Sequence, residues 1–301
     1  MKTRRPRRFG RTILRAALIY CVVALVLAGC ASKLILHPTR EAIPANGATR
    51  LQVLGPVETI EIWTMHSRGV RGREPRAFVI EFIGNAARAE WGVEDVSADW
   101  GDRPVEVWAV NYPGYGGSAG SASLKSIAPA ALAAYDAMKK KAGDRPTFVS
   151  GHSIGTTAAL CVAAHRPVSG LVLYNPPPLR KLIMGRFGWW NLWLAAIPVS
   201  LQVPGELDSL ANGRKCSAPA VFVLGEADEV VPPRYHQMVV DAYAGPKQLV
   251  RMPGATHNDP VSPEALPRFE AELDWLWKEA GAGEPATERK WEPRMGTNAH
   301  E

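Results

Sequence analysis

The sequence predicts an α/β fold with a mostly parallel central sheet and helices on both faces. Short apolar runs alternate with longer helical runs along most of the chain, as they do where crossover helices join parallel strands. Several of the short runs are dense in apolar residues, which is typical of strands buried on both faces. These runs are 77–84, 105–112, 147–151, 170–175 and 220–225.

The other elements follow in a simple order. Two β-like runs, 51–57 and 58–66, precede the buried strands, and 248–254 is the last strand. The predicted helices are 87–100, 124–142, 153–165, 233–244 and 263–280.

The segment 176–217 interrupts this alternation. It is too long for a simple loop and has a helical pattern of its own around 179–196, so we interpret it as a small helical cap over the carboxyl edge of the sheet. The composition becomes polar after Ala280, which predicts a loose tail at 281–301.

The N-terminus has the three parts of an export signal. A basic start is followed by an apolar run at 16–28, which is shorter than the roughly 20 residues of a membrane-spanning helix. The run ends in "LAGC", which resembles a bacterial lipobox, where the chain is cut before a cysteine that is then lipidated. We expect a signal peptide at 1–29, lipidation at Cys30 and a lead segment at 30–50; the alternative is an uncleaved signal anchor.

The lipobox implies a lipid-anchored protein of the bacterial cell envelope. Ala31 gives no acidic retention signal after the cysteine, which implies the outer membrane if the cell has two. Arginine pairs near the start point only weakly to twin-arginine export.

The charge distribution excludes nucleic acid as a partner. The formal net charge is +6, but all seven basic residues among the first 29 belong to the predicted signal, where no acidic residue occurs. The rest of the chain is therefore near neutral and lacks a basic run that would follow a phosphate backbone. The sequence does not specify an oligomeric state.

The four cysteines do not form a metal or redox motif. Cys21 lies in the signal and Cys30 takes the lipid. Cys161 and Cys216 are left, and in an oxidising compartment they could form a disulfide. We favour two unpaired, buried and unreactive thiols.

Two serines fit G-x-S-x-G, the pattern that places a nucleophile on a sharp turn between a strand and a helix. The pattern occurs by chance in roughly one in six chains of this length, so its context must decide. Ser153 directly follows the apolar strand 147–151 and directly precedes a helical run. Ser118 lies in a loop rich in glycine and serine, several residues beyond its strand. We therefore predict that Ser153 is the nucleophile.

A serine nucleophile needs a base, and the base needs an acid that orients it. In the hydrolase fold that carries this turn, the order along the chain is serine, acid, histidine. Among seven histidines, only His257 follows a late strand and precedes the final helix. The turn after the preceding strand offers Asp228 as the acid, with Glu226 as the alternative and Glu229 as a solvated charge.

With these residues the chain resembles the α/β-hydrolase superfamily from about Leu51 to Ala280. Within it, the resemblance is closest to the serine aminopeptidase-like branch, which includes protein depalmitoylases and lysophospholipid lipases. The family usually has histidine before the glycine at position 84, and this chain has Ile83. The matching motifs are "GNA" at 84–86, "NYPGYGGSAG" at 111–120, "GHSIG" at 151–155, "GEADEVVP" at 225–232 and "HND" at 257–259.

The resemblance implies a triad of Ser153, His257 and Asp228 and an oxyanion hole made of backbone N–H groups. Ile154 provides one donor, and Asn85, or its neighbour Ala86, provides the other. This chemistry needs no metal or organic cofactor, and no ligand cluster in the sequence indicates one.

The cap gives the best indication of the substrate. Its aromatic residues could line an acyl pocket, enter the membrane surface or simply pack the cap onto the sheet, and we slightly favour packing. Trp189, Trp190 and Trp193 are the candidates for substrate binding among Met184, Phe187, Trp189, Trp190, Leu192 and Trp193.

Three classes of function remain. We favour a membrane-tethered serine hydrolase that cleaves acyl esters or thioesters of small molecules or lipids. A serine peptidase is the first alternative, although the cap has no acidic cluster to hold a substrate amino terminus. The second is a catalytically idle binding lipoprotein, which the intact order of serine, aspartate and histidine argues against.

Overall fold

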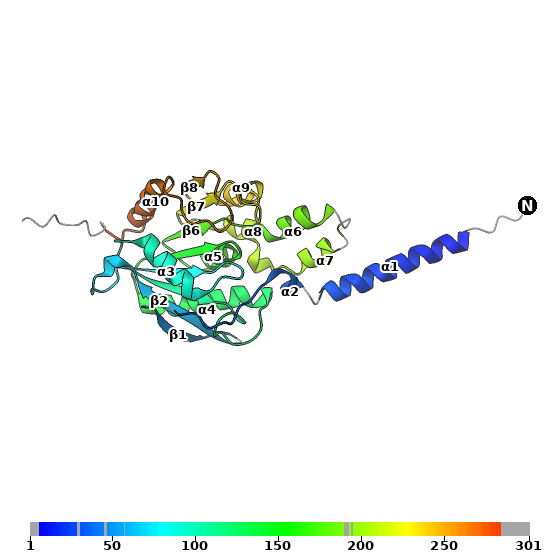
Figure 1. The fold of residues 1–301 in the computed structure, drawn as a ribbon, viewed down its shortest axis with the longest axis horizontal. Helices are drawn as coiled ribbons and strands as arrows, with labels where there is room; N and C mark the ends of the chain where they lie inside the picture. Colours follow the sequence, from blue (N-terminus) through cyan, green and yellow to red (C-terminus); the bar gives the residue numbers. More distant parts are fainter. Residues whose placement is uncertain are drawn as a thin grey trace, which may run out of the picture.

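The computed structural model describes residues 6–28, 31–44, 47–56, 58–189, 193 and 195–283. Within these residues the chain forms one eight-stranded sheet between two layers of helices (Figure 1). The strand order is β1-β2-β4-β3-β5-β6-β7-β8, in which β2 is antiparallel to both neighbours and the other pairs are parallel. The predicted fold class is confirmed. The strands are β1 (Thr49–Leu54), β2 (Thr59–His66), β3 (Ala77–Phe82), β4 (Val105–Asn111), β5 (Thr147–His152), β6 (Gly170–Tyr174), β7 (Ala220–Gly225) and β8 (Lys247–Met252).

The helices lie on the two faces of the sheet. One face is covered by α3 (Ala89–Trp100) and α10 (Leu266–Glu279), whose Trp100 and Trp277 rings are 6.1 Å apart. On the other face, α4 (Leu124–Ala142) contacts α5 (Ile154–His165), and the row continues through α8 to α9. The last two are α8 (Ser209–Gly213) and α9 (Pro233–Ala242).

The core explains why the central strands are so apolar. Every residue of β3, β4 and β7 is buried, because helices cover these strands on both sides. Where β5 meets α3 and α10, the Phe148 ring lies 4.7 Å from Trp100 and stacks on Trp277 at 6.1 Å. Of the three free cysteines among the described residues, Cys161 and Cys216 are buried. Burial raises their pKa values to about 11 and about 12, which disfavours the thiolate through which a cysteine reacts.

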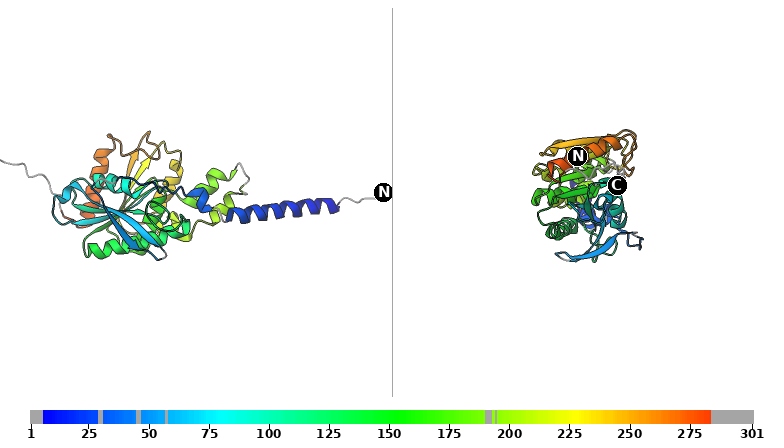
Figure 2. Two further views of the ribbon diagram at one scale, coloured as in Figure 1. Left: turned by 60° about the horizontal axis from the view of Figure 1, so that its bottom comes forward. Right: turned by 90° about the vertical axis from the view of Figure 1, so that its left-hand side faces the viewer.

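The N-terminal residues form two helices of different character. The first, α1 (Pro6–Ala28), extends away from the body and touches it at α7 (Ala196–Leu201) (Figures 1 and 2). Among the described residues, no helix combines the length and apolar character that a membrane crossing requires. The short α2 (Ala31–Ile35) and the chain up to Pro44 lie against the body instead. Ala31 and Leu36 are buried there, and the Ser32 hydroxyl accepts a hydrogen bond from the N–H of Leu124 at 3.1 Å.

The segment 176–217 forms several short helices. The helix predicted around 179–196 is instead α6 (Leu179–Phe187), which is followed by α7 and packs against it. Glycines at 185 and 188 lower the helix propensity of this stretch, and Gly188 caps α6. Two short 3-10 helices complete the described structure, η1 (Arg68–Val70) and η3 (Gly205–Leu207).

Candidate active site

Ser153 occupies a strained turn between β5 and α5. Its backbone has φ 52° and ψ −121°, a conformation that a residue with a side chain rarely adopts. The turn brings the start of α5 so close to β3 that a Cβ on Gly155 would overlap the carbonyl oxygen of Phe82. Position 155 therefore has no room for a side chain and requires glycine. A turn of this kind projects the serine side chain beyond the sheet edge.

The structure brings the three predicted residues together at the carboxyl ends of β5, β7 and β8. The Ser153 Oγ lies 2.9 Å from His257 Nε2, and the His257 Nδ1 lies 2.6 Å from Asp228 Oδ2. All three side chains are buried. One imidazole thus links a hydroxyl to a carboxylate, which is the arrangement that general-base activation of a serine requires.

Asp228 is held as a carboxylate by several donors. Its Oδ1 accepts hydrogen bonds from the N–H groups of Val230 and Val231, both at 2.8 Å. Its Oδ2 faces His257 and also lies 3.1 Å from the Nε2 of the buried His236. Burial alone would raise the pKa of Asp228, but the close His236 ring and the hydrogen bonds with His257 and Val231 outweigh it and hold the pKa well below its usual range.

The competing residues lie elsewhere. The Glu226 side chain is 40% exposed and lies 3.7 Å from Arg251. The Ser118 hydroxyl is buried, donates to the carbonyl of Asn111 at 2.6 Å and accepts from the N–H of Glu61 at 2.8 Å. Ser118 therefore serves to fix its loop against two strands.

The two expected oxyanion donors lie at the start of α5 and in the loop after β3. Ile154 is the first residue of α5, where backbone N–H groups have no intrahelical acceptor. Asn85 lies in the loop after β3, and its side chain is fully engaged. The amide Nδ2 donates to the carbonyl of Ile35 at 2.5 Å, and Oδ1 accepts from the His37 N–H at 2.9 Å and the Tyr115 hydroxyl at 3.1 Å.

Backbone strain also marks this loop. Ala86 has φ 60°, which costs free energy for any residue with a Cβ. Gly84 packs against the His152 ring. A Cβ at position 84 would come within 2.9 Å of His152 Nδ1. Ile83, which stands where the family usually has histidine, is buried in the core.

The sequence assigned no role to three residues that hold the His257 region, although Asp259 belongs to the "HND" motif. Asn175 donates from Nδ2 to the carbonyl of His257 at 2.9 Å and accepts the Gly225 N–H at 2.8 Å, which ties the ends of β6 and β7 to the histidine loop. Asp259 accepts from the N–H and the hydroxyl of Thr256 at 2.7 Å and 2.9 Å. His236 is the third. Asn175 directly follows the buried strand β6, and this position in the sequence could have marked it as a residue of the site.

Other predicted residues take no part in this arrangement. Trp189 and Trp193 are 69% and 42% exposed, so these two rings do not pack the cap onto the sheet. Cys30 and Trp190 lie outside the described residues. Among the residues that the structure describes, no group of histidine, cysteine, aspartate and glutamate could hold a metal ion.

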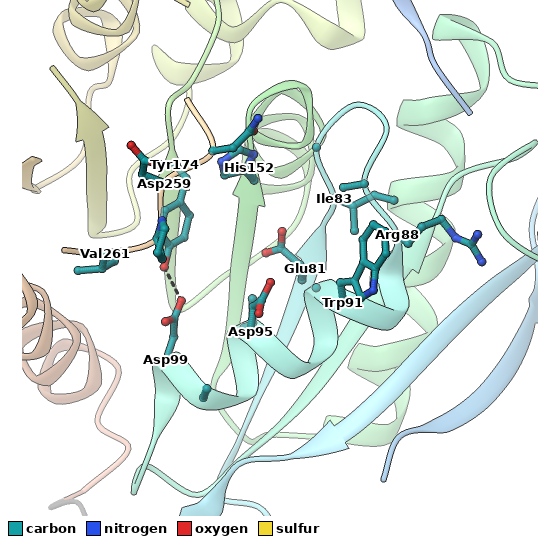
Figure 3. Close-up of a pocket in the computed structure, with 17 residues that line it drawn as sticks. Glu81, Ile83, Arg88, Trp91, Asp95, Asp99, His152, Tyr174, Asp259 and Val261 are labelled. Atoms are coloured by element: carbon teal, nitrogen blue, oxygen red, sulfur yellow. Dashed lines mark hydrogen bonds between the residues drawn. The ribbon is translucent and has the colours of Figure 1, made fainter. Parts of the chain in front are cut away.

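A cavity of about 540 Å³ opens beside the histidine loop, on the face of the sheet covered by α3. His152, which precedes the serine, and Asn258, which follows the histidine, both line it. Figure 3 shows His152 at one end of the cavity and the carboxyl groups of Glu81, Asp95 and Asp99 toward the other.

The chain is similar to known proteins both in sequence and in fold. The profile of the "Alpha/beta hydrolase family" matches residues 82–215. An uncharacterized protein of Mycobacterium tuberculosis is 29% identical over 174 residues, which are 55% of this chain and 59% of that protein. The lysophosphatidylserine lipase ABHD12 of Gallus gallus is 33% identical over 93 residues, covering 25% of this chain and 24% of the lipase. The chain thus spans less than two thirds of the length of these relatives.

Among solved structures, the esterase Pf2001 of Pyrococcus furiosus superposes with a TM-score of 0.63. It is 15% identical, and the match covers 82% of this chain and 98% of the esterase. This likeness concerns the fold alone. The chain therefore has the α/β-hydrolase fold, and the family profile matches part of it.

Proposed function

We propose that the protein is a serine hydrolase that cleaves acyl esters or thioesters through an acyl-enzyme. The observation that carries the proposal is the continuous hydrogen-bonded chain from Ser153 through His257 to Asp228. The partial sequence match to a lysophosphatidylserine lipase supports ester substrates, including lipids.

In the first step, the Ser153 Oγ attacks the acyl carbonyl while its proton passes to Nε2 of His257. Asp228 accepts the Nδ1–H, which fixes the tautomer of the ring and stabilises the positive charge that the ring gains. The backbone N–H groups of Ile154 and Asn85 meet the oxygen on which negative charge develops.

In the second step, His257 gives its proton to the leaving alcohol or thiol, and the acyl group stays on Ser153. A water molecule then attacks the ester, with His257 again acting as the base, and the free acid leaves. Each proton that the ring takes up is thus returned, and the enzyme ends in its starting state.

The proposed place of action is a bacterial membrane surface to which a lipid on Cys30 tethers the protein. Leu14 and Leu18 of α1 are exposed, as expected of a segment that inserts into a membrane or is removed. In the cap, Trp189 and Leu201 are also exposed, which suits contact with lipid.

Labelling with a fluorophosphonate probe tests the chemistry, because the probe reacts only with an activated serine. A panel of matched acyl esters, acyl thioesters and aminoacyl amides then separates the classes of function. We expect labelling and ester or thioester turnover. Turnover of the amides alone would identify a peptidase. The absence of both labelling and turnover would indicate a binding lipoprotein.

A further inference from the structure

The cavity beside the histidine loop has an unusual chemical lining. Part of its wall is apolar or aromatic, and Trp91 lies at its edge. Three carboxyl groups face the same space, Glu81 from β3 and Asp95 and Asp99 from α3 (Figure 3). The apolar members of the lining are Ile83, Ala87, Trp91, Val96, Ala98, Pro260 and Val261.

Glu81 is the most constrained of the three acids. Its residue is 4% exposed, and its Oε2 has no hydrogen-bond partner among the described residues. Burial raises the pKa of Glu81 to about 8, helped by the nearby Asp99 and Asp95, while the hydroxyl of Ser150 opposes the rise. Buried acceptors are rarely left without a donor in folded proteins, so the position calls for one.

Among the described residues that line the cavity, Arg88 is the cation, and it does not serve Glu81. The Arg88 guanidinium points away from Glu81 and bonds to Glu90 and to the carbonyl of Glu41 (Figure 3). Burial lowers the pKa of His152 to about 4, which keeps that ring neutral.

The remaining groups that face Glu81 are acceptors or are already bonded. The Tyr174 hydroxyl donates to Asp99 at 2.7 Å, and burial raises the pKa of Asp99 to about 6. Asp259 is bonded to Thr256. On the two neighbouring strands, Glu81 is paired with Ala109 and Ser150, neither of which carries a charge.

We propose that this cavity binds a primary ammonium group. Such a group brings the N–H donors that the Glu81 oxygen lacks and the positive charge that three carboxyl groups favour. A quaternary ammonium brings the charge without the donors. The Trp91 ring adds an aromatic surface of the kind that stabilises cations.

The place of the cavity connects this site to the proposed catalytic centre. The His152 ring lines the cavity and lies 5.3 Å from the His257 ring, edge to face. The ammonium group belongs either to a free small amine or to a substrate, and only the second source rests on the proposed function. In that case the substrate is an acyl ester that also carries a primary amine.

Calorimetric titration of the full chain with ethanolamine, choline and ethylene glycol tests the binding. We expect millimolar affinity for ethanolamine, at least about tenfold weaker binding of choline and no binding of the glycol. Glu81→Gln and Asp95→Asn should each weaken ethanolamine binding at least about tenfold, while Glu94→Gln on the same helix should not. Asp95 is exposed, so Asp95→Asn decides the matter if Glu81→Gln fails to fold.

Affinity should also increase with pH, because the ammonium group binds the ionised form of Glu81. Between about pH 6.5 and about pH 9 the ionised fraction of Glu81 rises roughly thirtyfold, and the affinity should rise by a similar factor while a simple amine stays mostly protonated. Equal binding of choline and ethanolamine, unchanged binding in both carboxyl variants, or no binding at about 10 mM would overturn the proposal.

Two further experiments distinguish a free amine from an amine on the substrate, and they test the amine site separately from the proposed hydrolase activity. Ser153→Ala should lose hydrolysis and keep ethanolamine binding, so a failure of catalysis leaves the site testable. Hydrolysis of an aminoethyl ester is compared with that of the matching hydroxyethyl ester. A preference for the aminoethyl ester that Glu81→Gln removes assigns the amine to the substrate, and ethanolamine binding without such a preference assigns it to a free amine.

Discussion

The Nε2 atom of His257 lies 2.9 Å from the Oγ of Ser153, although 104 residues separate the two in sequence. Three strands of the sheet, β5, β7 and β8, end near this point, and loops from their ends supply the serine, Asp228 and the histidine. The contact therefore depends on the whole parallel sheet, and a change that leaves the sheet intact but removes one group tests its chemistry directly.

Ser153→Ala should abolish both ester hydrolysis and fluorophosphonate labelling, because no other hydroxyl takes its place against His257. Ser118→Ala should keep most activity, but it leaves a buried carbonyl and a buried N–H without their partner. We expect it to lower the free energy of unfolding by about 1–3 kcal/mol. Labelling that survives Ser153→Ala and disappears in Ser118→Ala would reverse the assignment.

Asp228→Asn should keep the fold and lower kcat by about 10⁴-fold, because the histidine loses the acceptor that fixes its tautomer. Glu226→Gln is the matched control and should behave like the wild type. The kcat of both variants and of the wild type is measured on one ester. A large loss in Glu226→Gln alone would make Glu226 the orienting acid, and near-normal rates in both would refute the triad.

Much of this fold follows from local patterns in the sequence. Apolar runs such as 77–82 predict buried strands because both of their faces are covered, and the turn at 151–155 predicts the nucleophile because its glycines are needed where backbones touch. The order of strands along the chain then reduces the candidates for the base and the acid to His257 and Asp228.

Other features depend on contacts that only the folded chain creates. In the sequence, His236 looks like an ordinary residue of a helix. Its approach to Asp228 arises because α9 packs beside β7. The end of α6 at Phe187 was missed because apolar periodicity outweighed the glycines nearby. Glu81 did leave a signal, since a carboxylate inside an apolar strand needs an explanation.

Gly155→Ala should destabilise the protein, since its Cβ would overlap the Phe82 carbonyl in the central strand β3. Overpacking against backbone that cannot move aside typically costs about 1–3 kcal/mol, and the shift of α5 should also lower kcat. Gly205→Ala, where a Cβ meets nothing, is the control. Chemical denaturation of the two variants measures the effect, and equal stabilities would contradict the close approach.

Glu81 should make the protein less stable as pH rises. In the unfolded chain this carboxyl ionises near its ordinary pKa of about 4.3, whereas the folded protein holds the proton up to about 8. Between these values the unfolded state binds fewer protons, so the free energy of unfolding decreases with pH and levels off above the folded pKa. Glu81→Gln removes this loss. Relative to the wild type, it should gain roughly 4 kcal/mol between about pH 4.5 and about pH 8.5, and a pH-independent difference would contradict the burial of this group.

The Asn85 side chain joins the N-terminal lead to the loop of the expected oxyanion hole. Its three hydrogen bonds, to Ile35, His37 and Tyr115, hold the loop in a strained shape that includes the positive φ of Ala86. Asn85→Ala removes all three bonds but keeps the backbone N–H. If that N–H is an oxyanion donor, its displacement should lower kcat by about 10²-fold with little change in KM, because the oxyanion forms only in the transition state.

Tyr115→Phe is the graded control for this prediction, because it removes one of the three bonds and should lower kcat much less. Fluorophosphonate labelling should slow in Asn85→Ala in parallel with kcat, since the probe also develops negative charge on oxygen near Ser153. A rise in KM with kcat unchanged would show that the loop holds substrate, and unchanged kinetics would remove Asn85 from the oxyanion hole.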